Sequence, residues 1–496
     1  MRQKSVIIIG AGMGGISAAI HLAQRGFHVT VYEKNPHPGG RCDWIERDGH
    51  HFDTGPTLMV MPRVYDAEFS AMGTPMAALL DMQQVDPNYH LVFDDGTQLS
   101  LTCDMQSMKS QLEAIERGAY QGFLRYLKEG ERHYRVGMER MVNREFRKYT
   151  DFFNFSLVPL LFQVKPLVKH YDNMSAYFDN PRLKTAFSFQ DVYMGLSPFD
   201  APATFSLLPY TEIEHGVWYP KGGMYSIVEA AMTLAKQAGV EFAFDTTVEQ
   251  VVVKYGQVAW LEIEHDQQVK ADVILANADL PYVCQDLLPK DAYAQRLVHK
   301  RFSCSVVSFF WGVDKSYPQL GPHTLFLAED FRQNFVSIIK DLDLPDNPSI
   351  YIHAPSRLQN SMAPAGEDTI IAIIPVGHLS ENGDQDWEAR TDEARQHVFR
   401  RLASVGITDL AEHIKFETSY TPLSWKKRYN LVKGSTHGLS HNLLQLAYLR
   451  PANRHPHYRK LYFVGASTHP GTGLPTAMIS GRLVTQRIID ELPELE

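Results

Sequence analysis

An α/β fold is expected for this chain, because strand-like and helix-like segments alternate around glycine-rich turns at both ends of the sequence. The first such unit consists of a strand, a turn, a helix and a strand at 6–9, 10–15, 16–25 and 28–32. Another apolar strand at 461–464 is followed by a second glycine-rich turn and by a helix at 478–491. A short apolar run that ends in glycine and continues as an amphipathic helix is typical of a parallel α/β sheet.

The glycines of the first turn predict a dinucleotide site. Gly10 permits a tight turn, Gly12 allows close approach of the backbone to a pyrophosphate, and Gly14 or Gly15 allows the helix to pack closely on the strand. The phosphates are then expected at the helix N-terminus, where free N–H groups favour negative charge. Glu33 ends the second strand, where a carboxylate can accept the ribose hydroxyls.

Composition limits the classes of protein that are compatible with this chain. It has 496 residues, of which 44% are hydrophobic and 21% charged, which suits two or three globular domains. The formal net charge of −9 argues against nucleic acid as a partner. The four cysteines are far apart, so we expect neither a disulfide framework nor a metal site, and a reducing, cytoplasmic compartment. No signal peptide is visible.

Further elements are expected along the chain from apolar periodicity. The region 104–190 should be mostly helical, because charged and apolar residues interleave there. Additional helices are predicted at 225–238 and 387–403. Additional strands are predicted at 241–243, 248–253, 259–263, 273–276, 302–313 and 369–376.

Three more motifs point from a dinucleotide in general to a flavin. PGGR at 38–41 and DTGP at 53–56 follow the βαβ unit, and LYFVGASTHPGTGLP occupies 461–475. A nicotinamide dehydrogenase has no need of a glycine-rich element so near its C-terminus. A flavin does, because backbone N–H groups must reach the edge of the ring where negative charge collects on reduction. Pro475 suits the first turn of the helix that follows, whose dipole favours that charge.

On these residues the chain resembles the bacterial carotenoid desaturases, the family of phytoene and dehydrosqualene (diapophytoene) desaturases. The motifs that carry the resemblance are GAGMGG (10–15), PGGR (38–41), FDTGPT (52–57), GVWYPKGGM (216–224), NAD (277–279), MAPAGED (362–368), LRPANR (449–454) and LYFVGASTHPGTGLP (461–475). Two segments, VMPRVYDAEF at 60–69 and KGGMY at 221–225, look closer to the C30 branch, but a few residues do not determine substrate length.

The resemblance implies FAD as cofactor and a set of residues that bind it. That set is Gly10, Gly12, Gly14, Gly15, Glu33, Gly39, Gly40, Arg41, Gly55, Pro56, Val248, Gly465, Gly471, Gly473 and Leu474. Val248 begins a strand whose backbone meets the adenine in related flavoproteins. Ala466 stands where many of those proteins have an aspartate for the ribitol chain, so we expect FAD binding to depend more on backbone groups.

The resemblance also implies a domain organisation. We expect a Rossmann-like FAD-binding domain of the glutathione-reductase or amine-oxidase type, built discontinuously from 1–95, 215–285 and 440–496. A helical substrate and membrane-contact region would occupy 96–214. The sheet and helices of a mixed-sheet substrate domain would occupy 286–439.

The implied reaction is desaturation of a long isoprenoid hydrocarbon, in which a hydride passes to the flavin and a proton is lost. Because the allylic cation left behind is very acidic, no strong base and no compact catalytic triad are needed. Asp151 is a candidate acid/base, since family members carry an acidic residue there, although a solvated helix end explains it equally well. His469 lies in the flavin turn and could simply hold it. The electron acceptor would be oxygen or a quinone.

The apolar run at 152–164 has two explanations. A short run of this kind is usually a buried core segment. Basic residues flank it, however, and a hydrocarbon substrate is collected from a bilayer, so we favour a peripheral contact with the cytoplasmic membrane over 152–168.

Other functions stay open on the sequence alone. A carotenoid isomerase or terminal oxidase of the same superfamily would share the FAD motifs. A flavin amine oxidase would need a polar, aromatic-caged pocket and commonly a lysine near the flavin. A non-catalytic flavoprotein that binds apolar ligands and a homo-oligomeric assembly are also compatible with the sequence.

Overall fold

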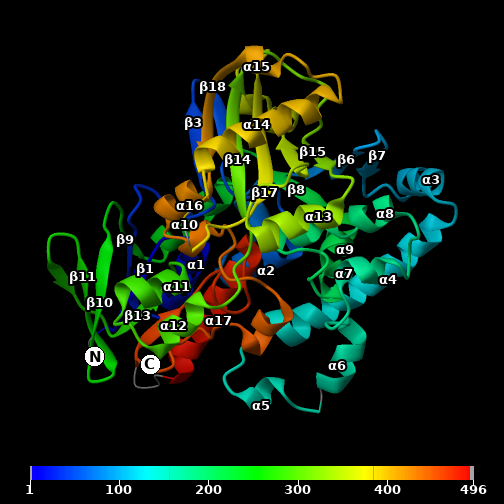
Figure 1. The fold of residues 1–496 in the computed structure, drawn as a ribbon. Helices are drawn as coiled ribbons and strands as arrows, with labels where there is room; N and C mark the ends of the chain where they lie inside the picture. The colour runs from blue at the N-terminus through cyan, green and yellow to red at the C-terminus, as the bar shows by residue number, and fades with distance from the viewer. Residues whose placement is uncertain (1–2, 156, 382, 384, 492–496) are drawn as a thin grey trace.

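A five-stranded parallel sheet, formed by segments far apart in the sequence, organises the cofactor half of the molecule (Figure 1). The computed structural model describes residues 3–155, 157–381, 383 and 385–491. In spatial order the strands are β19 (Leu461–Phe463), β13 (Val273–Ala276), β1 (Ser5–Ile9), β2 (His28–Tyr32) and β9 (Glu241–Ala243). Because all run parallel, their carboxyl ends meet at one edge, where ligands bind in such sheets.

Helices from the two ends of the chain pack together on this sheet. They are α1 (Met13–Gln24), α10 (Ser226–Gln237) and α17 (Leu474–Glu491), with α2 (Pro62–Ala71) beside α17. Ser17 Oγ donates to the carbonyl of Met478 at 3.0 Å. Across the other face lies the three-stranded antiparallel sheet of β10 (Val248–Lys254), β11 (Gln257–Ile263) and β12 (Gln267–Val269). Apolar residues of α11 (Leu280–Tyr282) and α12 (Ala292–Val298) belong to the same buried cluster.

A seven-stranded sheet forms the second half and stands at the top of Figure 1. Its order is β18 (Ile414–Tyr420), β14 (Ser305–Val313), β17 (Asp368–Val376), β16 (Ile350–His353), β15 (His323–Leu327), β6 (Tyr89–Phe93) and β7 (Gln98–Leu101). The accompanying helices are α13 (Phe331–Val336), α14 (Trp387–Ala403), α15 (Leu410–His413) and α16 (Pro422–Tyr429). Two-stranded pairs complete the β-structure: β3 (Trp44–Arg47) with β4 (His50–Asp53), and β5 (Met82–Val85) with β8 (Val217–Pro220).

The region predicted to be mostly helical is helical. It holds α3 (Met105–Ile115), α4 (Ala119–Gly137), α5 (Tyr149–Phe152), α6 (Leu157–Val164), α7 (His170–Met174), α8 (Pro181–Ala186), the 3-10 turns η3 (Phe189–Met194) and η4 (Ala203–Ser206), and α9 (Leu207–Glu214). Short helices α5 and α6 lie at the lower edge of the molecule in Figure 1. None of the helices described is both long and apolar enough to cross a membrane.

Most predicted elements are present, with shifts that have physical causes. Helix α1 begins at Met13 rather than three residues later, because Gly12 is already its N-cap and the glycine turn forms the first helical turn. Helix α17 begins at Leu474, which places Pro475 in its first turn as predicted. The apolar run at 152–164 is broken into α5 and α6; Ser156 lies outside the described residues, as do 1–2 and 492–496 of the expected cofactor domain.

One domain boundary is wrong as predicted. Strand β6 falls within 1–95, which we assigned to the cofactor domain, yet it pairs in parallel with β15 of the seven-stranded sheet. The register joins Thr324 to His90 and Leu327 to Phe93. Pairing across more than 200 residues of sequence leaves no local signal, so strand periodicity alone could not assign β6 to its sheet.

Packing of the first helix on the last gives a stability prediction. A Cβ on Gly481 of α17 would lie 2.7 Å from both the Ala18 backbone nitrogen and Ser17 Oγ. Gly481→Ala should therefore lower the free energy of unfolding by about 1–3 kcal/mol, seen as a lower urea midpoint by circular dichroism. Gly137→Ala is the control: Gly137 is helical and its Cβ would meet only Leu207 Cδ2 at 3.8 Å, so the midpoint should stay or rise. Equal effects of the two substitutions would contradict the packing argument.

Candidate functional site

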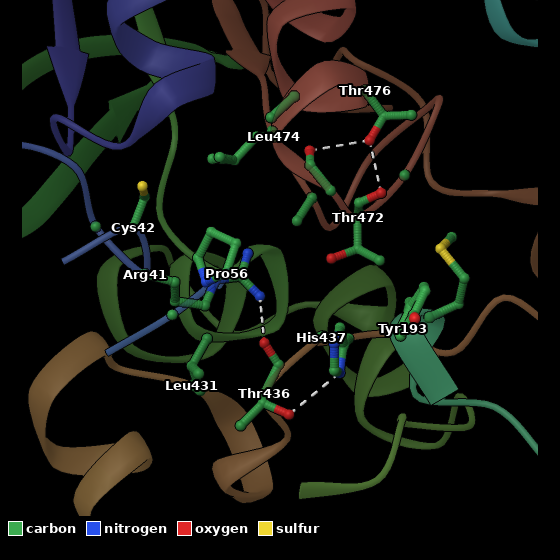
Figure 2. A pocket seen from close by; sticks show the side chains of 18 of the residues that line it. Arg41, Cys42, Pro56, Tyr193, Leu431, Thr436, His437, Thr472, Leu474 and Thr476 are labelled. Atoms are coloured by element: carbon green, nitrogen blue, oxygen red, sulfur yellow. Dashed lines mark hydrogen bonds between the residues drawn. The ribbon is translucent and has the colours of Figure 1, made fainter. Parts of the chain in front are cut away.

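One continuous cavity of about 630 Å³ runs from the parallel sheet into the second half of the molecule. At one end its wall is made of the glycine-rich turns after β1 and β19. At the other end its wall is made of aliphatic and aromatic side chains from η3, α9, α13, β14 and β17. Figure 2 shows part of this wall at close range. The site therefore joins a polar cradle to an apolar chamber.

Asn277 lies at the centre of the polar cradle. It follows β13, and its Nδ2 donates to the carbonyl of Gly10 at 3.1 Å. A Cβ on Gly12 or Gly14 would lie 2.9 or 2.8 Å from the Asn277 amide, and one on Gly465 would lie 2.8 Å from its Oδ1. Only glycine fits at these positions, so the turns after β1 and β19 can both close around one amide side chain.

The N-terminus of α1 is open to the cavity. Gly12, its N-cap, has an extended backbone and provides no side-chain cap, so the first N–H groups of the helix remain available for a phosphate. Glu33 is buried beside this turn and accepts hydrogen bonds from the N–H groups of Ala11 at 2.7 Å and Asn35 at 2.9 Å. Its carboxylate is thus held next to the phosphate position, and its remaining lone pairs can accept ribose hydroxyls.

A buried arginine, Arg450, holds the backbone of the last glycine-rich turn, which lies at the other end of the cradle. Among the described residues, the groups to which Arg450 donates are all backbone carbonyls, at 2.6–3.3 Å; these belong to Leu439, Ser440, Gln445, Ala466 and Thr468. Asp279 assists: it accepts from Ser467 Oγ at 2.6 Å and from the Val432 N–H at 3.0 Å. Burial raises the pKa of Asp279, while these hydrogen bonds oppose the rise. The turn is therefore positioned through its backbone, which fits the alanine at position 466.

Two histidines near this turn are held neutral. Burial lowers the pKa of His437 to about 3 and that of His441 well below its usual value. His441 Nε2 accepts from the Thr472 N–H at 3.0 Å, so its proton must be on Nδ1. That Nδ1 is buried, has no hydrogen-bond partner among the described residues, and belongs to a side chain of the cavity wall. An unsatisfied donor here fits a bound group with acceptor atoms, such as a flavin.

Figure 2 shows how Arg41 faces this end of the cavity from the opposite side. Its Nη1 donates to the carbonyl of Thr436 at 2.6 Å, and Thr436 Oγ1 is 3.1 Å from His437 Nδ1. Pro56 and Leu474 lie on the same wall in this view. The residues of PGGR and DTGP thus surround one space together with the last glycine-rich turn, which follows them by more than 400 positions.

The apolar chamber follows from strand alternation in the seven-stranded sheet. On β14, Val307 and Phe309 pack with α14, whereas Val306 and Ser308 line the cavity. On β17 likewise, Ile374 packs with α14 while its neighbours on the opposite face line the cavity. Because side chains alternate between faces, this sheet is covered by a helix on one side and forms a chamber wall on the other.

Almost all the cofactor residues predicted from the sequence meet at this cavity. Gly10, Gly12, Gly14, Glu33, Gly39, Gly40, Arg41, Gly55, Pro56, Val248, Gly465, Gly471, Gly473 and Leu474 line it. Gly15 does not. Its Cβ position is 2.5 Å from the Gly10 carbonyl oxygen, so Gly15 serves helix-to-strand packing, the alternative role considered for it.

Asp151 is not brought to the cavity. It lies in the first turn of α5, where its Oδ2 accepts from the N–H groups of Arg147 and Lys148, both at 2.9 Å. These bonds lower its pKa and explain the carboxylate as a helix cap, which does not support the acid/base role predicted for it. His469 Nε2 bonds the carbonyl of Arg144 at 2.7 Å and so connects the last glycine-rich turn to the helical region.

Several residues that shape the site were missed. NAD at 277–279 and LRPANR at 449–454 were recognised as motifs, but the roles of Asn277 and Asp279 depend on contacts with distant segments. That of Arg450 depends on loops within 18 residues of it, whose course the sequence pattern does not show. Tyr193, which also lines the cavity, lies in η3 with no flanking motif to mark it.

Comparison with known proteins identifies the family to which the chain is similar. Residues 13–489 match the family described as flavin containing amine oxidoreductase. A phytoene desaturase of Fusarium fujikuroi is 38% identical, with 99% of this chain and 90% of that protein covered. A zeta-carotene-forming phytoene desaturase of Myxococcus xanthus is 37% identical, covering 98% and 94%. A 4,4'-diapophytoene desaturase of Staphylococcus aureus is 32% identical, covering 99% of each.

Solved structures share the fold at low sequence identity. A putrescine oxidase bound to putrescine aligns with a TM-score of 0.66 at 14% identity, covering 99% of both chains. A fatty acid isomerase from P. acnes aligns with a TM-score of 0.61 at 13% identity, covering 99% of this chain and 98% of that one.

The role of Arg450 can be tested by removing its charge. Arg450→Met should leave buried carbonyl groups unpaired, lower the free energy of unfolding by about 3 kcal/mol or more, and reduce the flavin bound per purified chain. Flavin absorbance against protein concentration measures the second effect. Arg459→Met is the control, because Arg459 makes one exposed side-chain bond at 3.5 Å. Full flavin content in Arg450→Met would show that the turn does not depend on this residue.

Proposed function

This chain belongs to the flavin-containing amine oxidoreductase family, in the branch of the phytoene and diapophytoene desaturases, and we propose that it is an FAD-dependent carotenoid desaturase. It would introduce C=C bonds into a long isoprenoid hydrocarbon. The single observation that carries this proposal is the continuous cavity, in which a cradle suited to a dinucleotide opens into an apolar chamber. A substrate without polar groups can be bound there only by burial of its apolar surface.

FAD is the cofactor that this cradle suits. The pyrophosphate would meet the N-terminus of α1 between Gly10 and Gly14, and the ribose would meet Glu33. The flavin would lie toward Arg41 and the turn at 471–474, whose glycines permit close approach of backbone N–H groups. When bound, FAD supplies the two-electron acceptor for the hydride.

The residues of the chamber would orient the substrate and exclude water from it. A polyene threaded between η3, α13 and β17 would have one carbon–carbon bond held beside the flavin position. Apolar walls also exclude water from the cationic centre that hydride loss leaves behind, which prevents its capture by water. The chain therefore needs no triad of the hydrolase kind.

Phytoene is the first substrate to test, because the phytoene desaturases reach 38% identity, above the 32% of the staphylococcal diapophytoene desaturase. This difference weighs against the weak C30 indication from 60–69 and 221–225. The electron acceptor, oxygen or a quinone, stays part of the proposal, as does association into homo-oligomers.

We also propose peripheral attachment to the cytoplasmic membrane through the segment 149–168. Of the twelve large apolar side chains exposed among the described residues, eight belong to it: Tyr149, Phe153, Phe155, Val158, Leu161, Phe162, Leu167 and Val168. Monomeric proteins rarely expose an apolar patch of this kind to water. Charge contributes less than predicted, since Arg147 pairs with Glu145 and Asp490, and Lys165 pairs with Glu129.

An amine oxidase is the less favoured alternative. Among the described lining residues the single lysine is Lys34, which is beside Glu33 at the nucleotide end and donates to Asn430 Oδ1 at 2.9 Å. A lysine near the flavin, which that activity commonly uses, is thus lacking in the part of the wall described. Isomerase and terminal oxidase activities would use the same cavity, and the product distinguishes them.

Expression in a carotenoid-free bacterium that makes phytoene or diapophytoene tests the proposed activity. We expect coloured products with two hydrogens fewer per step by mass, because each added C=C bond extends the conjugated system. The strain that responds identifies the substrate length. Colourless extracts from both strains, with FAD-loaded protein present, would contradict desaturation and favour the alternatives.

Liposome flotation tests the membrane contact. Phe155, Phe162 and Leu167 are 95, 80 and 73% exposed, so replacing all three by serine should weaken binding at least about 100-fold without harming the core. The matched control replaces Tyr255 and Leu423, exposed by 97 and 52% on other elements. Unchanged flotation of the triple variant, or an equal loss in the control, would contradict this attachment site.

A further inference from the structure

A polar cluster is buried in the wall of the apolar chamber. At its centre is Glu212 of α9, whose side chain is 1% exposed. Glu212 Oε1 accepts from the Tyr89 hydroxyl at 3.0 Å, and its Oε2 accepts from Gln190 Nε2 at 3.1 Å. Burying a carboxyl group in apolar surroundings is costly, and a hydrocarbon site needs no such group for binding.

Hydrogen bonds connect this carboxyl group to the cavity in one direction. The Tyr193 hydroxyl donates to the Tyr89 hydroxyl at 2.6 Å, and Tyr89 donates to Glu212. Of the three side chains, only Tyr193 lines the cavity; Tyr89 and Glu212 lie behind it. Both donors therefore point away from the chamber and toward the carboxylate.

Tyr193 is at the cofactor end of the chamber. Figure 2 shows it on the wall with His437 and Thr472. The turn that ends η3 also lies close to His437, because a Cβ on Gly195 would be 3.0 Å from His437 Nδ1. The cavity end of the hydrogen-bonded chain is thus near the place where the substrate would lose hydrogen.

The surroundings leave Glu212 without a compensating positive charge. It forms no ion pair in the part of the chain that the structure describes. Its carboxyl group faces the two tyrosines and Gln190, and its backbone oxygen accepts from Asn88 Nδ2 at 2.8 Å and lies 3.7 Å from Cys103 Sγ. A histidine beside Tyr89, His323, has its ring 6.0 Å from that of the tyrosine, and burial lowers its pKa well below the usual value. Burial raises the pKa of Glu212 to about 7, where a carboxylate can take up a proton and release it.

We propose that Tyr193, Tyr89 and Glu212 form a proton relay that removes the proton lost by the substrate during desaturation. This inference rests on the proposed function. Tyr193 would be the catalytic residue, because it meets the substrate, and the other two would act through it. A neighbouring polar chain, in which the Tyr351 hydroxyl is 2.7 Å from both Thr57 Oγ1 and His323 Nδ1, has no carboxylate in which to store a proton.

The step balances in atoms and electrons. One hydrogen leaves the substrate as hydride, with its electron pair, to the bound flavin, which is the oxidant. The C–H bond on the neighbouring carbon breaks, and its electron pair becomes the new π bond. The proton binds the Tyr193 oxygen while the Tyr193 hydroxyl proton moves to Tyr89 and that of Tyr89 moves to Glu212. Both tyrosines end neutral and Glu212 ends protonated.

The test compares the flavin-loaded wild type with Glu212→Gln, Tyr89→Phe and Tyr193→Phe. Anaerobic bleaching of the flavin by phytoene or diapophytoene in liposomes is followed from below to above pH 7. The wild-type rate should rise through about pH 7, because only deprotonated Glu212 accepts a proton. In each variant we expect a rate about 100-fold lower and no such rise. Gln190 Oε1 has no hydrogen-bond partner among the described residues, and after rotation of the Gln190 amide it can accept from the amide of Glu212→Gln, so that variant should fold.

Tyr126→Phe is the matched control. Tyr126 is a buried tyrosine bonded to His170 and to the Phe187 carbonyl, and it does not line the cavity. It should keep the wild-type rate and pH profile.

A second readout needs no turnover. Infrared titration of the flavin-loaded protein should show a carboxyl C=O band that disappears as pH rises through about 7 and is absent from Glu212→Gln. If no such band titrates, Glu212 is not the proton acceptor and the relay is overturned. If Tyr193→Phe and Tyr89→Phe behave like Tyr126→Phe while the wild type desaturates, the relay is overturned and the proposed function stands. If no isoprenoid bleaches the wild type, the proposed function fails, and with it the relay.

Discussion

Closure of the cofactor cradle depends on one amide side chain. Asn277 is surrounded by Gly12, Gly14 and Gly465, so the turns after β1 and β19 approach each other across the end of β13. Any larger residue at those glycines would push the turns apart. Because the α1 N-terminus and the last glycine-rich turn both depend on this spacing, the phosphate end and the flavin end of the site are positioned together. The rest of the cavity takes its place from the sheet edge that this contact defines.

The two halves of the cavity suit ligand parts of opposite polarity. The cradle offers backbone donors and the neutral His441 to a polar ligand, whereas the chamber offers mainly apolar walls from β14, β17 and α13. The carboxyl group of Glu212 lies behind the chamber surface, separated from it by Tyr89 and Tyr193. A dry chamber protects a cationic substrate from water, but it also needs a route for the proton. The hydrogen-bonded tyrosines keep both conditions compatible.

Local patterns predicted the elements and the residues that border the nucleotide, because glycine turns and strand periodicity are local properties. Strand β2 has the predicted bounds, and Gly10 and Glu33 lie together as expected. What could not be predicted depends on long-range pairing. Strand β6 joins a sheet formed mostly by residues beyond 300, and Asn277 gains its role only when the turns after β1 and β19 close around it. Asp151 shows the opposite error, since resemblance suggested chemistry where a helix end needed a cap.

Packing of α1 against α17 has a consequence for how the protein is made. The glycine turn that begins α1 is synthesised more than 400 residues before the helix that covers it and the strand β19 beside β13. Until then the face of α1 that packs against α17 has no partner, and the cradle has only one of its two turns. The complete cradle therefore forms only after the last glycine-rich turn has been synthesised, and the exposed apolar face must be shielded from aggregation until then.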